Sequence, residues 1–146
     1  MTYDALTISR YVVKYSDDNC YNISNLKLQK LLYFIQCHFL IKRGEICFND
    51  NIEAWNLGPV VPAVYREYKK FGAGNIPGVY VQNKMLNEYI FDSDKKLIEE
   101  VVNRLSSYSA IDLVEITHNQ SPWKKSYSKN CNRIIQIKYI EEYFCK

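Results

Sequence analysis

The sequence predicts a mainly α-helical fold of about six helices with one small β-hairpin. In most segments of the chain, apolar residues recur at the spacing of an amphipathic helix. Capping residues or glycines stand at the ends of several of these segments. Only residues 46–55 combine a short apolar alternation with a polar turn. The chain of 146 residues has the length of one domain, so we expect a single domain over 1–146.

The bounds of the first two helices are predicted from residues that commonly cap or end a helix. Residues 3–16 place apolar side chains on one face, and Thr2 is the expected N-cap. The longest helix is expected over 25–43, where Ser24 caps the first turn. Gly44 can adopt the left-handed conformation that ends a helix, so we expect the helix to stop there.

The long helix carries apolar side chains on more than one side, so we expect it to be the most buried element. Lys27, Lys30 and Cys37 share the stripe that remains. A stripe left over by core packing is free for other contacts, which makes the two lysines candidates for binding a partner. The main apolar arc consists of Leu28, Leu31, Leu32, Ile35 and Phe39.

The β-hairpin is predicted to pair residues 46–48 with 52–55 across the polar turn 49–51. A helix over 62–71 follows, with apolar residues at helical spacing, and Gly72 ends it.

A buried corner connects the hairpin to this helix. Gly58 can take a positive φ, and Pro59 fixes its own φ and lacks an N–H group. Trp55 is one of the bulky apolar residues around this turn, where a surface loop would be polar. Pro62 stands where a helix tolerates proline best, at its first position. We therefore assign these four residues to a structural motif, with Trp55 packed against the long helix.

The second half of the chain predicts further helices and one loose stretch. Residues 72–78 are rich in glycine and are the expected mobile loop. Residues 79–91 alternate weakly, which allows short strand structure. Pro122 begins a short turn that carries Trp123. The expected helices are 94–106 after the cap Ser93, 110–118 after the cap Ser109, and 133–144.

Composition narrows the classes of function. The five cysteines are odd in number and none are spaced as a CxxC pair, which favours reduced thiols in a cytoplasmic protein. The longest central apolar run, residues 31–35, is too short to cross a bilayer, and no secretory leader is recognisable, so no membrane contact is expected. The formal net charge of +3 is too small to imply nucleic-acid binding by itself.

The pattern of reactive side chains does not predict an enzyme. The two histidines, His38 and His118, lie in predicted helices and form no recognisable catalytic set with a cysteine or serine. His118 stands at a helix C-terminus, where it either interacts with the helix dipole or contacts a partner. We expect no catalytic residue, no cofactor and no metal ion.

Three sequence blocks form the most distinctive pattern of the chain. The first block is residues 25–33, Asn-Leu-Lys-Leu-Gln-Lys-Leu-Leu-Tyr, in the long helix. The second runs from Ile52-Glu53-Ala54-Trp55 through Gly58-Pro59-Val60-Val61-Pro62 to Val64-Tyr65. The third is Thr117-His118 followed by Ser121-Pro122-Trp123. Taken together, the three blocks resemble the Panacea-domain family, which comprises SocA-like antitoxins and phage-associated proteins. One departure is Asn56-Leu57, where family members often carry an aromatic residue before the Gly-Pro pair.

The resemblance implies a helical domain that acts as the antitoxin of a bacterial or prophage toxin–antitoxin pair. Such a protein silences the cognate toxin, made from a neighbouring gene, by direct stoichiometric binding. The residues that we expect at the partner surface are Lys27, Lys30, Tyr65, His118 and Trp123.

Two alternatives remain open. One is a nucleic-acid-binding regulator that uses the basic segment 124–138, which contains Lys124, Lys125, Lys129, Arg133 and Lys138. The other is an enzyme of unknown class, which would need a polar pocket around a titratable group such as His118.

Overall fold

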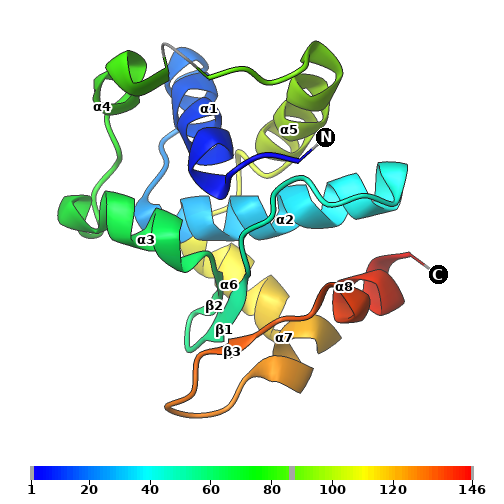
Figure 1. Ribbon diagram of the computed structural model, residues 1–146. Helices are drawn as coiled ribbons and strands as arrows, with labels where there is room; N and C mark the ends of the chain where they lie inside the picture. The colour runs from blue at the N-terminus through cyan, green and yellow to red at the C-terminus, as the bar shows by residue number, and fades with distance from the viewer. Residues whose placement is uncertain (1, 86–87, 146) are drawn as a thin grey trace.

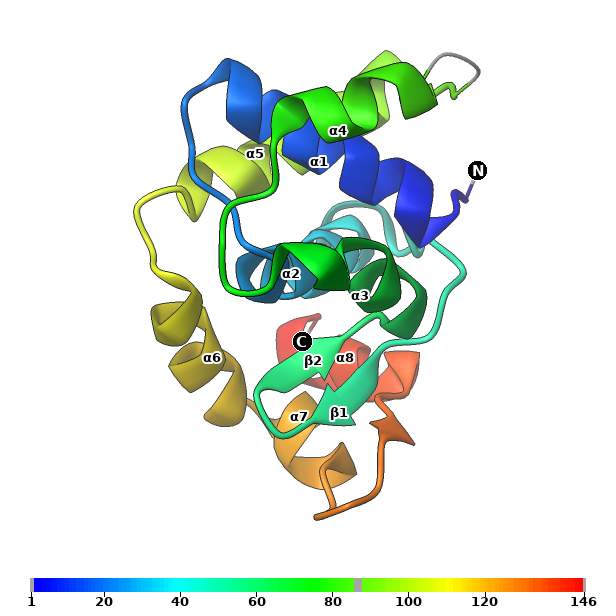
Figure 2. The same ribbon diagram turned by 90° about the vertical axis from the view of Figure 1, so that its left-hand side faces the viewer.

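A central helix organises the molecule. The computed structural model describes residues 2–85 and 88–145. Helix α2 (Asn25–Arg43) runs through the middle, with helices on one side and the sheet with further helices on the other (Figures 1 and 2). The first side holds α1 (Ala5–Asp18), α4 (Gly78–Gln82) and α5 (Asp92–Arg104). The second side holds the sheet, α6 (Ala110–His118), α7 (Ser121–Ser126) and α8 (Ile137–Phe144).

The fold class predicted from the sequence is confirmed. The described residues form eight α-helices, the 3-10 turns Lys69–Phe71 and Asn83–Met85, and one small antiparallel sheet. Two short helices were not predicted as such: α4 lies where strand structure was allowed, and α7 contains the predicted turn at Pro122. Residues 86–87 of the ambiguous segment lie outside the described residues.

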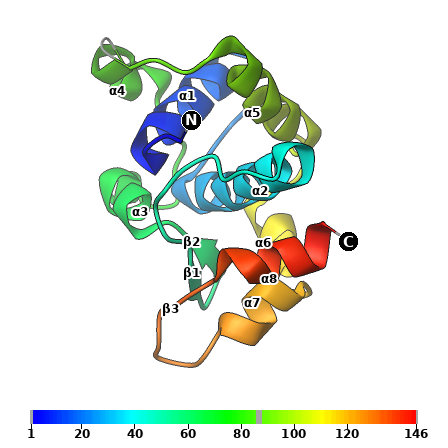
Figure 3. The ribbon, with the colours of Figure 1, turned by 45° about the vertical axis from the view of Figure 1, so that its right-hand side comes forward.

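Helix α2 is buried along most of its length, as predicted. Ser24 Oγ accepts a hydrogen bond from the N–H of Lys27 at 3.2 Å, and Gly44 has the left-handed φ of 67°. Because α1, α3 (Pro62–Tyr68), α5, α6, α8 and the sheet all contact α2, even most of its polar side chains are removed from solvent. Figure 3 shows α8 lying below α2, with the chain from the third strand leading into it.

The hairpin does not form where the sequence predicted it. Strand β1 (Glu53–Trp55) pairs with the following β2 (Gly58–Val60), not with residues 46–48. On its other edge β1 pairs with β3 (Arg133–Ile134), which gives the order β2-β1-β3. Asn56 and Leu57 form the turn without a positive φ, and Gly58, which follows with a positive φ, returns the chain to the sheet opposite Trp55.

Two helix starts also differ from the prediction. The expected helix 133–144 begins only at Ile137, because Arg133 and Ile134 pair with β1 instead. Helix α5 begins at Asp92 with Phe91 as N-cap, so Ser93 lies inside the helix.

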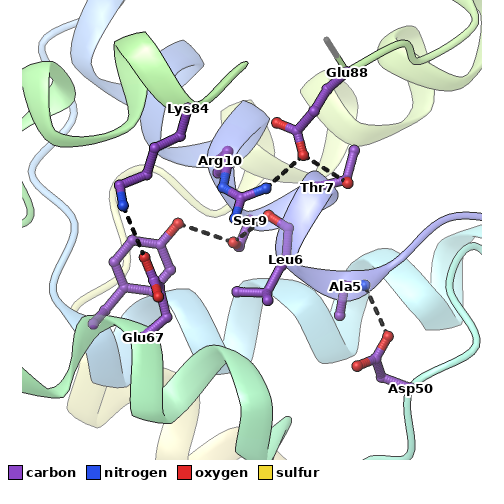
Figure 4. A network of polar contacts seen from close by, with 10 residues as sticks. Ala5, Leu6, Thr7, Ser9, Arg10, Asp50, Glu67, Lys84 and Glu88 are labelled. Carbon is purple, nitrogen blue, oxygen red and sulfur yellow. Dashed lines mark hydrogen bonds and ion pairs between the residues drawn. The ribbon is translucent and has the colours of Figure 1, made fainter. Parts of the chain in front are cut away.

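Long-range polar contacts fix the position of α1 (Figure 4). The helix begins at Ala5, whose N–H donates to Asp50 Oδ1 at 2.9 Å, so the acceptor comes from a distant loop. Thr2 does not cap the helix; its hydroxyl accepts from Asn49 Nδ2 instead. Further along α1, Arg10 and Thr7 both donate to Glu88 Oε2, at 2.6 and 2.7 Å. Tertiary partners therefore replace the local cap that the sequence suggested.

Candidate functional site

The turn between β1 and β2 is pressed against α2 and α6. Gly58 has a φ of 106°, which confirms the positive φ predicted for it. A Cβ atom at this position would lie 2.7 Å from Lys30 Cε and 2.9 Å from Thr117 Oγ1. Glycine is therefore required here for two reasons. The backbone has a positive φ, and the side chains of Lys30 from α2 and Thr117 from α6 leave no room for a Cβ atom.

Lys30 lies beneath this turn and not on a free stripe of α2, which corrects the expectation from helical spacing. Its side chain is fully buried, and Nζ donates to the carbonyl oxygen of Pro59 at 3.0 Å. Burial disfavours the charged ammonium form and lowers the pKa of Lys30 to about 7. In this position Lys30 holds the hairpin onto the long helix.

The other residues of the expected stripe are buried as well. Lys27 Nζ donates to the backbone carbonyl of Ser106, at 3.1 Å, beyond the end of α5. Desolvation lowers the pKa of Lys27 and raises that of the Cys37 thiol, in both cases by disfavouring the charged form. The stripe faces neighbouring elements because α2 is covered on nearly all sides.

Three stacked aromatic side chains hold the outer side of the turn. The ring of Trp123 lies between those of His118 and Tyr127, with centroid distances of 4.1 and 4.5 Å. Trp123 Nε1 donates to the carbonyl oxygen of Trp55 at 2.8 Å. His118 Nε2 lies 2.9 Å from the carbonyl oxygen of Asn56 and must carry the proton, since that oxygen can only accept. We call His118, Trp123 and Tyr127 the aromatic clamp.

A groove opens on the other side of the turn. The rings of Trp55 and Tyr65 meet edge to face, with centroids 5.0 Å apart. Trp55 is partly buried and lines this groove together with Asn25, Leu26 and Gln29 of the long helix. The groove has a volume of about 450 Å³, and its lining consists of Asn25, Leu26, Gln29, Trp55, Asn56, Leu57, Val60, Tyr65, Lys69, Gly72 and Ala73.

Two buried amides form the polar floor of this groove. Gln29 Oε1 accepts from the N–H of Val61 at 2.9 Å, and Gln29 Nε2 donates to Asn25 Oδ1 at 2.9 Å. Asn25 Nδ2 in turn donates to the carbonyl oxygen of Tyr65 at 3.1 Å. These bonds connect α2 to Val61, which lies between β2 and α3, and to Tyr65 within α3, so they fix the shape of the groove.

The predicted site residues thus divide into two groups. Tyr65, His118 and Trp123 gather at the surface around the hairpin turn, whereas Lys27 and Lys30 lie inside. Asn56 and Tyr127 were not predicted as site residues; the Tyr127 hydroxyl donates to Asn56 Oδ1 at 3.2 Å and so connects the aromatic clamp to the turn. Asn25 and Gln29 were not predicted either, although both stand in the block of α2 that carried the family resemblance.

The aromatic clamp gives a first prediction. We expect Trp123→Phe to lower the free energy of unfolding by about 1–2 kcal/mol, because a half-buried carbonyl loses its donor while the ring stack remains. Tyr127→Phe removes a hydrogen bond that water can replace, so we expect a loss below about 0.5 kcal/mol. Urea denaturation of both variants measures the difference, and equal losses would contradict this role of Trp123.

The basic segment 124–138 is spread over several elements. Lys124, Lys129 and Arg133 are exposed, and Lys129 lines a second hollow of about 380 Å³ together with Asn56 and residues 127–132. Lys125 Nζ lies 3.5 Å from Glu142 Oε2 and over the ring of Tyr139. The charge of Lys125 is therefore partly balanced by Glu142. Nucleic-acid binding by this segment stays a prediction.

Among the residues that the structure describes, no cluster of histidine, cysteine, aspartate or glutamate side chains could hold a metal ion. Within the same residues, no helix combines the length and the apolar character needed to cross a bilayer.

Comparison with known proteins identifies the family. Residues 28–124 match the family described as antitoxin SocA-like, Panacea domain. The chain is similar to Antitoxin SocA of Caulobacter vibrioides (strain NA1000 / CB15N), with 38% identity over 109 residues. The aligned region covers 69% of this chain and 58% of that relative, so the chain spans only part of the relative's length. No solved structure matches significantly. The family match includes the hairpin, Lys30 and most of the aromatic clamp, and the chain belongs to the SocA-like, Panacea-domain antitoxin family.

Proposed function

We propose that this protein is an antitoxin that neutralises a toxic protein, encoded by a neighbouring gene, through direct stoichiometric binding. The observation that carries the proposal is the family match over residues 28–124 together with the similarity to Antitoxin SocA. In this proposal neutralisation requires no catalytic turnover and no cofactor, and takes place in the cytoplasm, where the five free cysteines would remain reduced.

The surface around the hairpin turn supports a binding role. Trp55, Tyr65 and Trp123 are partly exposed, and Leu57 at the tip of the turn is 47% exposed. Aromatic side chains of this kind supply most of the energy at protein interfaces when they are held rigidly. The aromatic clamp and the amide floor provide that rigidity, so little ordering would be needed on binding.

The predicted partner residues take two roles in this proposal. Tyr65, His118 and Trp123 would contact the toxin directly. Lys27 and Lys30 would act indirectly, since buried side chains cannot touch a partner but can hold α5 and the hairpin in place.

Titration of antitoxin against toxin tests the proposal. The toxin gene is expressed from an inducible promoter while this protein is supplied at increasing levels, with an unrelated protein of similar size as control. We expect growth to recover and to saturate near a fixed molar ratio of the two proteins. Rescue by a small fraction of that amount would mean catalysis and would contradict stoichiometric binding. Absence of rescue would contradict the antitoxin role with this toxin.

A further inference from the structure

The groove beside the hairpin turn is suited to an apolar group. Most of its wall is formed by Leu26, Trp55, Leu57, Val60 and Tyr65. The amide atoms of Asn25 and Gln29 at its floor already have partners within the protein, as described above. An occupant therefore need not supply polar groups to the floor. The volume of about 450 Å³ lies within the range of roughly 300–1,000 Å³ typical of ligand sites.

The rim of the groove carries positive charge. Among the described residues that line the groove, Lys69 carries the only charged side chain, and it is exposed. Glu67, the acidic residue of the same segment, points elsewhere: its Oε2 accepts from the Tyr80 hydroxyl at 2.8 Å and lies 3.7 Å from Lys84 Nζ. Among the described residues Lys69 has no ion-pair partner, so the rim offers a free cation next to an apolar hollow.

The apolar surface continues beyond the hollow. Leu57, at the tip of the turn, is 47% exposed and extends the apolar wall onto the outer surface. A small molecule confined to the hollow would leave this side chain uncovered, whereas a polypeptide lying across the rim would cover it. The arrangement therefore favours a protein segment as the occupant.

We propose that this groove receives a short segment of the partner protein in which a large apolar side chain is followed closely by a carboxylate. The apolar side chain inserts between Trp55, Leu57 and Tyr65, and the carboxylate of an aspartate or glutamate pairs with Lys69. This inference rests on the proposed function for the identity of the partner, the toxin, but the chemistry of the groove can be tested without it.

Selection from a library of displayed random peptides tests that chemistry directly. The full-length protein is immobilised, and enriched peptides are synthesised and measured by fluorescence polarisation. We expect the enriched sequences to combine a leucine or aromatic residue with a nearby acidic residue. We expect Lys69→Glu to weaken their binding about tenfold or more, because attraction becomes repulsion. Peptides selected on the Lys69→Glu variant should instead carry a basic residue beside the apolar one.

The neighbouring lysine provides a matched control. Lys70 is also exposed, but its Nζ lies 4.2 Å from the ring centroid of Tyr80, and Lys70 is not part of the groove lining. We expect Lys70→Glu, the same change of charge one residue away, to alter peptide affinity less than about twofold. Ala73→Trp, which fills the mouth of the groove from an exposed position, should abolish binding with little change in melting temperature.

Three results would overturn the inference. They are enriched peptides with no acidic preference, equal effects of Lys69→Glu and Lys70→Glu, and undiminished binding to the Ala73→Trp variant.

Toxin neutralisation by the same variants separates the two proposals. If the wild type neutralises the toxin and the Lys69→Glu and Ala73→Trp variants do so equally well, the groove is wrong and the antitoxin role stands. If the wild type fails to neutralise, the antitoxin role fails, and the peptide data still decide the chemistry of the groove.

Discussion

Gly58→Ala is expected to lower the free energy of unfolding by about 2–6 kcal/mol, a large share of the stability of a domain of this size. The backbone at φ 106° strains any residue with a Cβ atom, at a cost of about 1–3 kcal/mol. The new methyl group would also lie 2.7 Å from Lys30 Cε and 2.9 Å from Thr117 Oγ1, and overpacking adds about 1–3 kcal/mol. Urea denaturation followed by circular dichroism measures the loss.

Gly44→Ala is the matched control for this prediction. Gly44 also has a positive φ, 67°, but nothing lies within 4 Å of the position where its Cβ would be. The same substitution there should cost only the conformational strain, about 1 kcal/mol. The difference between the two variants reports the steric contact of the hairpin with α2 and α6 together with the greater backbone strain at φ 106°. Equal losses in the two variants would contradict the close packing that we assign to Gly58.

The second large effect is expected in the pH dependence of stability, through Lys30. Burial lowers the pKa of Lys30 to about 7 in the folded protein, whereas an unfolded lysine has a pKa of about 10.4. Between these values the unfolded state binds more protons than the folded state, so the free energy of unfolding rises with pH. Between about pH 7 and 8.5 we expect a rise of about 1–2 kcal/mol, against an upper limit of roughly 1.4 kcal/mol per pH unit.

Lys30→Met should remove this rise, because methionine has similar length and does not titrate. Lys42→Met serves as the control: it deletes the same charge from an exposed position of α2 and should retain the slope. Chemical denaturation at several pH values gives the slope for each protein. A wild-type stability that stays flat from pH 7 to pH 8.5 would contradict the buried, uncompensated position of Lys30.

The measurement is confined to this window because buried thiols act in the opposite direction at higher pH. Burial raises the pKa of Cys37 and Cys47, so these groups keep their protons in the folded state. An unfolded cysteine loses its proton above about pH 8.5, which favours the unfolded state. Stability should therefore pass through a maximum and then fall.

Features that depend on a few neighbouring residues were predictable. Ser24 and Gly44 delimit α2 as expected, and Ser109 with Asp112 forms a capping box at the start of α6. Pro62 stands in the first turn of α3. Each of these features follows from the backbone preference or the hydrogen-bonding reach of one side chain, which operates within a single turn of helix.

Features that depend on which distant segments meet were not predictable in the same way. Helical periodicity correctly placed Lys27 and Lys30 on one stripe of α2. It does not predict which other elements pack on that stripe and bury it. The strand β1 could pair with residues 46–48 or with β2, and only the packing of the chain selects between them. The start of α8 was wrong for the same reason, since β3 uses Arg133 and Ile134 to extend the sheet.

The candidate site lies between these two cases. By itself, the sequence determined that the chain is mainly helical, that Gly58 takes a positive φ, and that Tyr65, His118 and Trp123 belong to its distinctive blocks. Only the tertiary structure decided that His118 and Trp123 bind the backbone of the hairpin turn, while Lys30 supports the same turn from inside. The physical reason is range: caps and turns are satisfied by neighbours in the chain, whereas burial and long-range hydrogen bonds are determined by all the elements that pack around a residue.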